Sequence, residues 1–544
     1  MRLPNLATEK YRWMALIFLA LGLAIVIIDN TVLNVAIPYI LRDLNTSFDA
    51  IQWVVSGYAL IIATLLITVG RLGDMFGRKR IFLLGTVFFA VGSFIASIAP
   101  NVMWLFIGEA LIEAIGASMM LTSSLSLLVS EFHGRERAIA FGVWGSVAGA
   151  SASLGPLLGG FLTAYYSWRW SLRINVIVAI IAILGSVFIK ESKGEHAKQF
   201  DWLGTFFSGI GLFSLIFGFI EGRKFGWWTP NEPFTIDGWT WPLKNISAIP
   251  FAFGLAAIFL ALFILTEYRL EKEGKSPLLK LSLFKIPGFS FGLTALGIVS
   301  MGQFGVFFIL PIYLQNALGL DAFKTGVVFL SASIAVAVFG PLSGFIASKI
   351  GPKWLASVGM YVTSLGTYLL FLSLSPTATG WSLAPALVFF GIGIGMASAQ
   401  LTNVILSSTP VSLAGEASAA NATMRQVGTS IGIAIIGVIL ASRLTINLEN
   451  YILSDNTIPQ TVRQKIVEHT KNISVESGQR QRNFSGMPSQ IAQSMKEDIN
   501  KALTDAAKSA LLFALFVNLL GAFFSLQIPN TKPLSPEEMV KMQE

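Results

Sequence analysis

The sequence of 544 residues contains no cysteine, only three histidines and few charged side chains. Without cysteine there are no disulfides and no thiolate metal ligands, and the histidines lie in predicted loops without the spacing of a metal-binding motif. Charged residues make up 12% of the chain, about half of their share in an ordinary soluble domain. We therefore expect no metal site, no enzyme and no water-soluble fold.

A nucleotide-driven pump is not expected either. The triplet Gly274-Lys275-Ser276 has the ending of a phosphate-binding loop, but such a loop needs a glycine at the position that Arg269 occupies. We predict no cofactor, so an ion gradient is the expected source of energy for any transport.

Apolar runs long enough to cross a bilayer recur from Trp13 to Gln527. About 20 helical residues span the hydrocarbon core, and backbone that faces lipid must satisfy its own hydrogen bonds. The runs lack the alternation of apolar and polar residues that is typical of a membrane barrel. We predict an all-α integral membrane protein with 14 transmembrane helices near residues 13–37, 50–70, 81–99, 102–129, 137–163, 170–189, 202–220, 247–268, 287–313, 325–347, 354–373, 381–407, 416–442 and 509–527.

The distribution of basic residues predicts the orientation. With the N-terminus in the cytoplasm, 21 of the 38 Lys and Arg residues fall in cytoplasmic segments and 6 in short outer loops, as the positive-inside rule requires. An even number of spans then places both termini in the cytoplasm. We predict a multi-pass protein of the cell (inner or plasma) membrane, and since this bias explains the net charge of +8, no nucleic-acid partner.

A faint repeat divides the chain. The pattern Gly70-x-x-x-Asp74-x-x-Gly77-x-Lys79 after the second predicted span recurs as Gly-x-x-x-Ser-x-x-Gly-x-Lys at residues 344–353 after the tenth. Two related six-helix bundles with the substrate site between them are a known transporter architecture. We predict an N-terminal bundle at 1–200, an inserted helix pair at 201–270 and a C-terminal bundle at 271–544.

A long polar segment at about 443–506 is placed outside the membrane by this topology. Ile491, Met495, Ile499 and Leu503 recur in it at helical spacing, so we expect an amphipathic helix that extends the last span outward. The segment could be a solvated cap, a gate over the outer mouth or a partner-binding element.

The loop after the second span, residues 70–80, is glycine-rich and basic. Its glycines allow a tight turn and close helix approach, and its basic triplet suits the cytoplasmic side. The loop resembles the signature loop of the major facilitator superfamily, and the whole chain resembles the fourteen-span drug:proton antiporters within it. The resemblance implies the major-facilitator fold and a latch that stabilises the outward-open state, although the loop could also serve only to anchor the topology. The residues concerned are Gly70, Asp74, Gly77, Arg78, Lys79 and Arg80.

The fifth predicted span carries a glycine pattern that resembles the motif of exporters in this superfamily. Small residues let neighbouring helices approach closely, and a proline removes a backbone donor and bends the span. The pattern favours export over uptake, although glycine-rich packing is common in membranes. It consists of Gly145, Gly149, Gly155, Pro156, Gly159 and Gly160.

Acidic residues inside two predicted spans are the strongest functional candidates. Asp29 lies near the middle of the first span, within a sequence that resembles the acidic motif of the fourteen-span group. A carboxyl group at this depth is costly to ionise, so Asp29 could hold a proton and release it when a cation arrives. A structural hydrogen bond within the bundle is the alternative.

The fourth span carries Glu109 and Glu113, which share one helix face because they are four residues apart. Relatives usually have an arginine at the position of Ala110, so the usual basic partner is missing. Two like charges on one face disfavour simultaneous ionisation, so the pair should keep at least one proton. The alternative is that one glutamate pairs with Arg173 or with water.

Further residues could line a substrate site. Aromatic faces suit a lipophilic cation, although aromatic residues at helical spacing more often serve packing. A buried arginine needs partners and could be a structural counter-ion or a contact for acidic cargo. The candidates are Trp53, Tyr58, Phe304, Phe308, Tyr313 and Arg425.

These residues together predict a monomeric, proton-coupled antiporter that exports lipophilic, cationic small molecules by alternating access between two bundles. Its predicted partners are a small-molecule substrate and the lipid bilayer, with protons as the coupling ion. Export of a lipid, a siderophore or another metabolite by the same fold is the alternative. A channel is disfavoured because no pore-lining pattern is evident.

Overall fold

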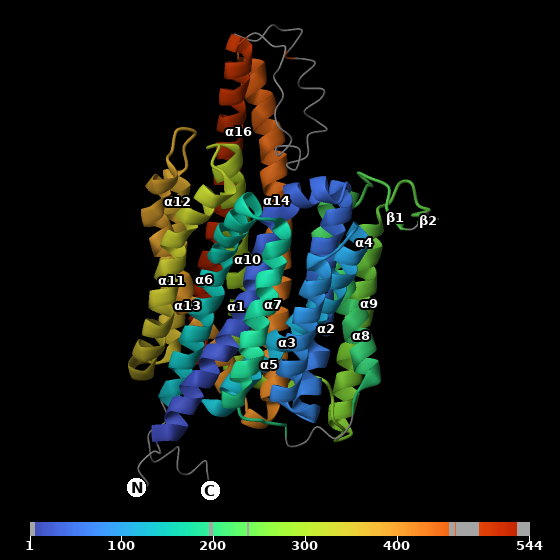
Figure 1. Cartoon of the computed structure of the whole chain (residues 1–544), viewed down its shortest axis with the longest axis vertical. Coiled ribbons are helices and arrows are strands. Elements are labelled where there is room, and N and C mark those ends of the chain that lie inside the picture. The colour runs from blue at the N-terminus through green and yellow to red at the C-terminus, as the bar shows by residue number, and fades with distance from the viewer. Residues whose placement is uncertain (1–5, 195–199, 237–238, 456–462, 464–488, 530–544) are drawn as a thin grey trace.

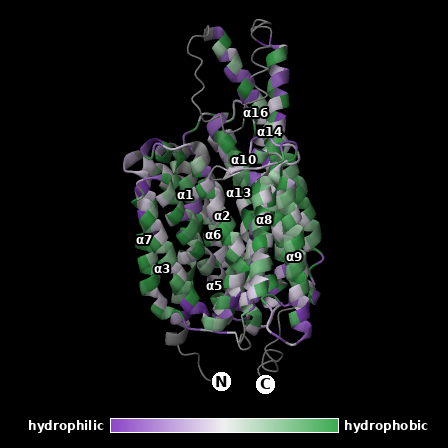
Figure 2. Cartoon of the chain, turned by 90° about the vertical axis from the view of Figure 1, so that its right-hand side faces the viewer, coloured by the Kyte–Doolittle hydropathy of each residue, from purple (hydrophilic) through white to green (hydrophobic). Residues whose placement is uncertain are grey.

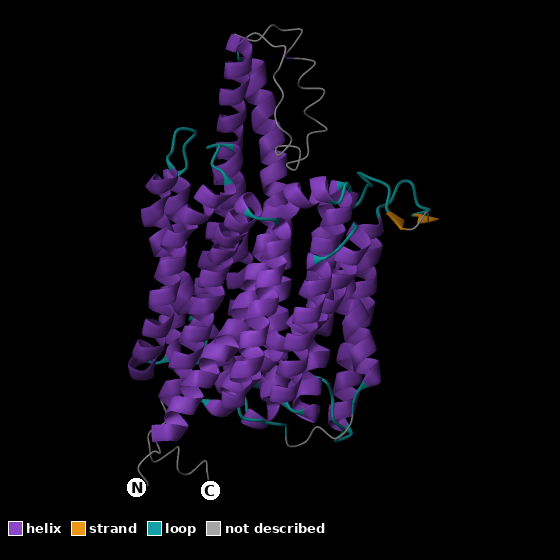
Figure 3. Cartoon of the chain, in the orientation of Figure 1, coloured by secondary structure: helices purple, strands orange, loops and turns teal. Residues whose placement is uncertain are grey.

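The computed structural model describes residues 6–194, 200–236, 239–455, 463 and 489–529, and this part of the chain is almost entirely helical (Figure 3). Its long helices are α1 (Leu6–Asp43), α2 (Phe48–Phe76), α3 (Arg78–Ser97), α5 (Ala114–Glu131), α6 (Gly134–Tyr165), α7 (Trp168–Gly185), α8 (Trp202–Phe225), α9 (Ala248–Lys272), α10 (Pro287–Asn316), α11 (Ala322–Ile350), α12 (Pro352–Ser373), α13 (Ala384–Ser407), α14 (Ala414–Ser454) and α16 (Ser489–Ser525). Shorter elements are α4 (Val102–Leu105) and the π-helix η1 (Phe106–Glu113), which continue directly into α5, the 3-10 helices η2 (Ser186–Phe188), η3 (Leu281–Lys285), η4 (Gly380–Leu383) and η5 (Val411–Leu413), and the strands β1 (Thr235–Ile236) and β2 (Trp239–Thr240).

The predicted set of fourteen spans is confirmed in outline. Within the described residues, 13 helices are long and apolar enough to cross a membrane. The remaining long helix, α6, has 32 residues and packs against α1, α11 and α13 inside the bundle. Apolar residues cover the sides of the bundle and polar residues gather at its ends and on the protruding helices (Figure 2). The small antiparallel hairpin β1–β2 in the loop between α8 and α9 was not predicted.

Local sequence signals set the ends of many helices. Ser47, Asn101, Ser167 and Asp321 each precede a helix and accept a hydrogen bond from one of its first backbone N–H groups. Gly77 separates α2 from α3 at a φ of 112°, and Gly351 separates α11 from α12 at a φ of 92°. Only glycine adopts such angles without strain. The two glycines occupy equivalent positions of the predicted repeat.

The helices alternate in direction, so that α1 begins and α16 ends at the same end of the bundle, here called the inner end (Figure 1). Two long pairs join the first six spans to the last six: α6 packs along α11, and α2 packs along α14. Close backbone contact explains the first pair, because a methyl group at Gly344 would collide with the backbone of Ala138.

The inserted helices α8 and α9 pack on each other, and α8 also contacts α2 and α14. The boundaries at 200 and 270 remain a prediction. At the opposite, outer end, α14 and α16 extend beyond the other helices as a pair (Figure 1). Tyr451 of α14 donates a hydrogen bond to Asp505 of α16 at 2.6 Å. The predicted helical extension of the last span is confirmed, since α16 runs from Ser489 to Ser525, and its place outside the cell stays a prediction. The thirteenth span also runs to Ser454, past its predicted end at 442.

Candidate functional site

Three carboxyl groups meet inside the first bundle. Asp29 of α1 and Glu109 and Glu113 of η1 each place a carboxylate oxygen within 4.8 Å of the other two. Their side chains are at most 1% exposed. We call these three residues the carboxyl cluster. The sequence analysis selected these three residues separately on two spans, and the structure brings them into one group.

The backbone around Glu109 and Glu113 is a π-helix, which the sequence analysis did not foresee. A π-helical turn is wider than an α-helical turn and is found mostly as a single turn at functional sites. Here eight residues, Phe106–Glu113, adopt it, and both glutamates are buried. Ala110, at the position where the family resemblance implies an arginine, is fully buried and packs near Gly57. An arginine could not occupy this position without displacing α2.

Close packing of α3 against η1 fixes the position of this π-helix in the bundle. A methyl group at Gly92 would come within 2.6 Å of the carbonyl oxygen of Gly108 and would collide with the backbone nitrogen of Glu113. Neither atom is the end of a flexible side chain, so the backbone itself would have to move. The glycine therefore lets α3 approach and hold Glu113 in place.

We expect Gly92→Ala to lower both thermal stability and transport, because overpacking at a backbone contact costs about 1–3 kcal/mol and displaces Glu113. The measurement is thermal unfolding of the purified protein together with uptake into vesicles. Gly254→Ala is the matched control, since no atom lies within 4 Å of a methyl group at that helical glycine. Equal stability and equal transport in the two variants would contradict this role for Gly92.

Asn175 of α7 connects the cluster, and the sequence analysis missed it. Its side-chain nitrogen donates to Asp29 Oδ1 at 2.6 Å and to Ser93 Oγ at 3.0 Å, and it lies 3.4 Å from Glu113 Oε1. An amide nitrogen has two hydrogens, so it cannot serve all three acceptors at once. A lone amide in an apolar span was the available signal. Arg173, the partner considered from the sequence, instead lies over the ring of Trp170 at 5.4 Å.

The cluster has no basic counter-ion among the residues that the structure describes. Asp29 Oδ2, Glu109 Oε2 and Glu113 Oε2 are buried without a hydrogen-bond partner. Three adjacent ionised carboxylates cannot persist away from water, so at least one of them must hold a proton or the group must bind a cation. One oxygen from each carboxylate could also serve as a metal ligand, and the expectation of no metal site stays a prediction.

The predicted aromatic residues differ in their contacts. Tyr58 of α2 is 2% exposed, and its hydroxyl group has no hydrogen-bond partner. Trp53, also on α2, stacks on Phe217 of the inserted helix α8 at 6.2 Å between ring centroids. Tyr313 of α10 is fully buried and donates a hydrogen bond to Ser375 O at 2.6 Å, a packing contact that ties down its hydroxyl group.

Phe304 and Phe308 of α10 are partly buried. Phe304 packs near Phe307, with 6.2 Å between ring centroids. Arg425 of α14 donates a hydrogen bond to Thr402 Oγ1 of α13 at 3.3 Å, a contact within the second half of the chain. The roles of these residues in lining a substrate site stay predictions.

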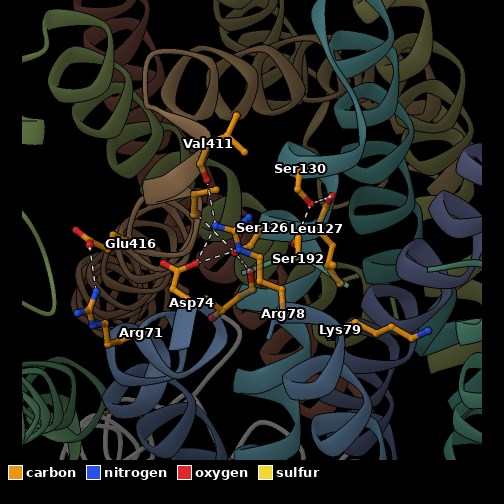
Figure 4. Close-up of polar contacts among 12 residues, drawn as sticks. Arg71, Asp74, Arg78, Lys79, Ser126, Leu127, Ser130, Ser192, Val411 and Glu416 are labelled. Atoms are coloured by element: carbon orange, nitrogen blue, oxygen red, sulfur yellow. Dashed lines mark hydrogen bonds and ion pairs between the residues drawn. The ribbon is translucent and has the colours of Figure 1, made fainter. Parts of the chain in front are cut away.

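Residues of the signature loop meet α14 at the inner end. Arg78 donates to Asp74 Oδ1 from Nη2 at 2.8 Å and from Nε at 3.0 Å, and its Nη2 also donates to Val411 O at 3.1 Å. Both side chains of this ion pair are at most 2% exposed. Arg71 pairs with Glu416 of α14 at 3.7 Å. Figure 4 shows these contacts, which join the two halves of the chain and are here called the inner gate.

The remaining loop residues lie around this gate. Gly70 approaches α14 so closely that a methyl group there would lie 2.8 Å from Gly415 O. Lys79 points away from the gate (Figure 4), and its backbone N–H donates to Glu191 at 3.0 Å. Arg80 pairs with the same Glu191 at 3.8 Å on the surface. Gly77 makes the turn described above.

The glycines of the predicted exporter motif lie on two sides of α6. Gly155 and Gly159 face α1 near Thr31 and Val32, whereas Gly149 faces Val336 and Gly160 faces Phe323 of α11. Gly145 lies beside Ala399 of α13. Pro156 lies within α6, and its side chain is outside the described part of the structure. Gly145, Gly149 and Gly160 therefore lie at the seam between the halves, and Gly155 and Gly159 pack α6 onto α1 within the first half.

The chain is similar in sequence to known resistance and export proteins. The chain is 33% identical over 438 residues to the tetracenomycin C resistance and export protein of Streptomyces glaucescens, covering 79% of this chain and 76% of that protein. It is 28% identical to the multidrug resistance protein Stp of Mycobacterium tuberculosis, covering 84% and 81%.

Among solved structures, the proton:xylose symporter XylE shares the fold. Its TM-score is 0.59 at 13% sequence identity, covering 99% of this chain and 100% of that one. The sequence profile of the Major Facilitator Superfamily matches residues 19–433. With its helical bundle and its seam between two halves, the chain belongs to the major facilitator superfamily of membrane transporters.

Proposed function

We propose that this transporter exports lipophilic, cationic small molecules in exchange for protons. The observation that carries the proposal is the carboxyl cluster, which is buried, lacks a basic partner and must hold a proton or a cation. A site of this kind can bind either species but not both at full charge, which is the requirement for exchange. The names of the relatives, which refer to drug resistance and export, support export over uptake.

The inner end faces the cytoplasm in this proposal, and the membrane is the cell membrane. The basic residues of the loops at that end support this orientation. The inner gate then closes the cytoplasmic side, and its opening, together with closure of the outer side, would carry the cluster from one face to the other. The transporter acts as a monomer, with a small-molecule substrate.

The test uses purified protein in vesicles that hold a pH-sensitive dye, with a panel of cationic, neutral and anionic fluorescent substrates. We expect an imposed pH gradient to drive accumulation of the cations, and addition of a cation to move protons in the opposite direction. Substrate movement that ignores the pH gradient would refute the proposal.

Export of an acidic or neutral metabolite is a second candidate. The observation that favours it is Arg425, a guanidinium group within the membrane-spanning part of α14 that donates a hydrogen bond to the neutral Thr402. The same panel separates the two functions, because a metabolite exporter would move the anionic or neutral substrates and ignore the cations.

A further inference from the structure

A pair of carboxyl groups, separate from the carboxyl cluster, lies at the inner end between the inserted helices. Asp201 caps α8, since its Oδ1 accepts the N–H of Gly204 at 2.8 Å. Glu267 of α9 is 0% exposed, and its Oε2 accepts the N–H of Leu279 at 2.9 Å. The other two oxygens, Asp201 Oδ2 and Glu267 Oε1, converge beside Gly204, where a methyl group would collide with both.

These two oxygens lie against the same point beside Gly204, yet neither has a donor among the described residues. Two ionised carboxylates this close together would repel each other and would lose their hydration. A single proton shared between them removes the repulsion and satisfies both oxygens. The geometry therefore requires one bound proton at this pair.

The charged groups of the described residues do not replace that proton. Glu416 of α14 adds negative charge toward Glu267, and the nearby cations Lys280 and Arg71 act on Glu416. On α9, the carboxylate of Glu271 accepts the N–H of Ser282 at 3.2 Å. Among the described residues outside the pair, Glu416 of α14 is the charged group that acts on Glu267, and Lys280 of the following loop and Arg71 and Asp74 of α2 act on Glu416. Arg269 and Glu271 flank Glu267 on α9.

The pair is connected to the inner gate through two consecutive backbone amides. Leu279 N donates to Glu267, and Lys280 N donates to Glu416 at 2.8 Å. Glu416 in turn pairs with Arg71 of the gate. Residues 278–280, here called the strap, thus attach α9 on one side and the gate helix α14 on the other.

We propose that Asp201 and Glu267 form a proton-binding site that holds the inserted helices on the inner gate. With the proton bound, Glu267 stays in place and the strap keeps Glu416 oriented toward Arg71. When the proton leaves through the half-buried Asp201 to water at the inner end, the doubly charged pair separates and the strap loosens. The inserted helices then act as a pH-dependent brake on opening, which goes beyond cargo exchange at the carboxyl cluster.

The test measures opening of the inner gate as a function of pH at the inner side, without cargo. The chain has no cysteine, so Ser123→Cys, at a buried position of α5 near Gly73, introduces a single reporter. Inside-out vesicles expose the inner end to a membrane-impermeant maleimide. The labelling rate at each pH is divided by the rate for the same cysteine in unfolded protein at that pH, because the thiolate is the reacting form and its fraction rises with pH. We expect this normalised rate to rise with pH, by up to about tenfold per unit where one proton is released on opening.

Two variants imitate the protonated pair and should abolish this rise. In Glu267→Gln the amide can donate to Asp201 and still accept from Leu279 N. Asp201→Asn keeps the helix cap and carries the test if the first variant does not fold. Glu271→Gln is the matched control, because it removes a charge one turn away on the same helix and should keep the full rise.

The proposal is overturned if both imitating variants keep the pH dependence of the native pair, or if Glu271→Gln loses it to the same extent. Because cargo is absent, this outcome is independent of drug export. Native protein that shows the pH-dependent labelling but no pH-driven efflux would refute the proposed function and leave the proton site standing.

Discussion

Asp29→Asn and Glu113→Gln should each abolish efflux that is driven by a pH gradient, while protein yield and thermal stability stay close to those of the native chain. Each change removes a titratable oxygen from a cluster whose carboxylates lie within 4.8 Å of one another. The remaining groups can still bind cargo, but the proton that cargo must displace is lost. Downhill movement of cargo should therefore persist where uphill movement disappears.

The measurement is dye accumulation in vesicles with and without an imposed pH gradient. Glu131→Gln is the control, because it removes a carboxylate at the inner end of α5, away from the carboxyl cluster. Glu131 lies 4.0 Å from Lys190. Glu109→Gln should lower the rate with partial retention of coupling. Full coupling in both Asp29→Asn and Glu113→Gln would remove the cluster from the mechanism.

Arg78→Ala should open the inner gate. The substitution leaves Asp74 buried and charged without its partner, which costs about 3–5 kcal/mol for a buried ion pair broken from one side. In the open state Asp74 can be hydrated, so the penalty falls on the closed state alone. We expect the equilibrium to shift toward opening by about two to four orders of magnitude.

Labelling of the Ser123→Cys reporter measures this shift. Arg80→Ala is the matched control from the same loop, because its ion pair with Glu191 is long and its side chain is 69% exposed, so little effect is expected. Adding Asp74→Asn to Arg78→Ala should restore part of the closed population, since the buried charge is then gone. Unchanged labelling in Arg78→Ala would mean that this ion pair does not hold the gate.

Much of the fold could be predicted because long apolar runs have few alternatives in a membrane. The predicted repeat also extends to the backbone. Its equivalent glycines at 77 and 351 both have a positive φ at a helix junction, a conformation that selects glycine. The outward extension of α14 was not predicted because the polar composition after residue 442 marks the end of a span and not the end of a helix.

The candidate site was only half visible in the sequence. Helical spacing placed Glu109 and Glu113 on one face, but a π-helical turn depends on packing against α3 that no local pattern encodes. Asn175 reaches Asp29 from a helix 146 residues away along the chain, a contact that only tertiary packing determines. The same holds for Glu267, whose partners come from α8 and from the strap.

The absence of the usual arginine at position 110 has a structural explanation. Ala110 is fully buried beside Gly57 of α2, and Asn175 supplies a neutral hydrogen bond in place of a charge. A neutral partner cannot fix the ionised state of the cluster as a guanidinium group would. In the proposed exchange, protons or a cationic substrate balance its charge.

The direct test of this charge balance is to count the protons released when a lipophilic cation binds to purified protein in weakly buffered detergent solution. Proton release that follows the binding curve, and that disappears in Asp29→Asn although the cation still binds, is the expected result. Saturable binding of the cation by the native protein with no proton release between about pH 6 and 8 would contradict the exchange of protons for cargo at this site.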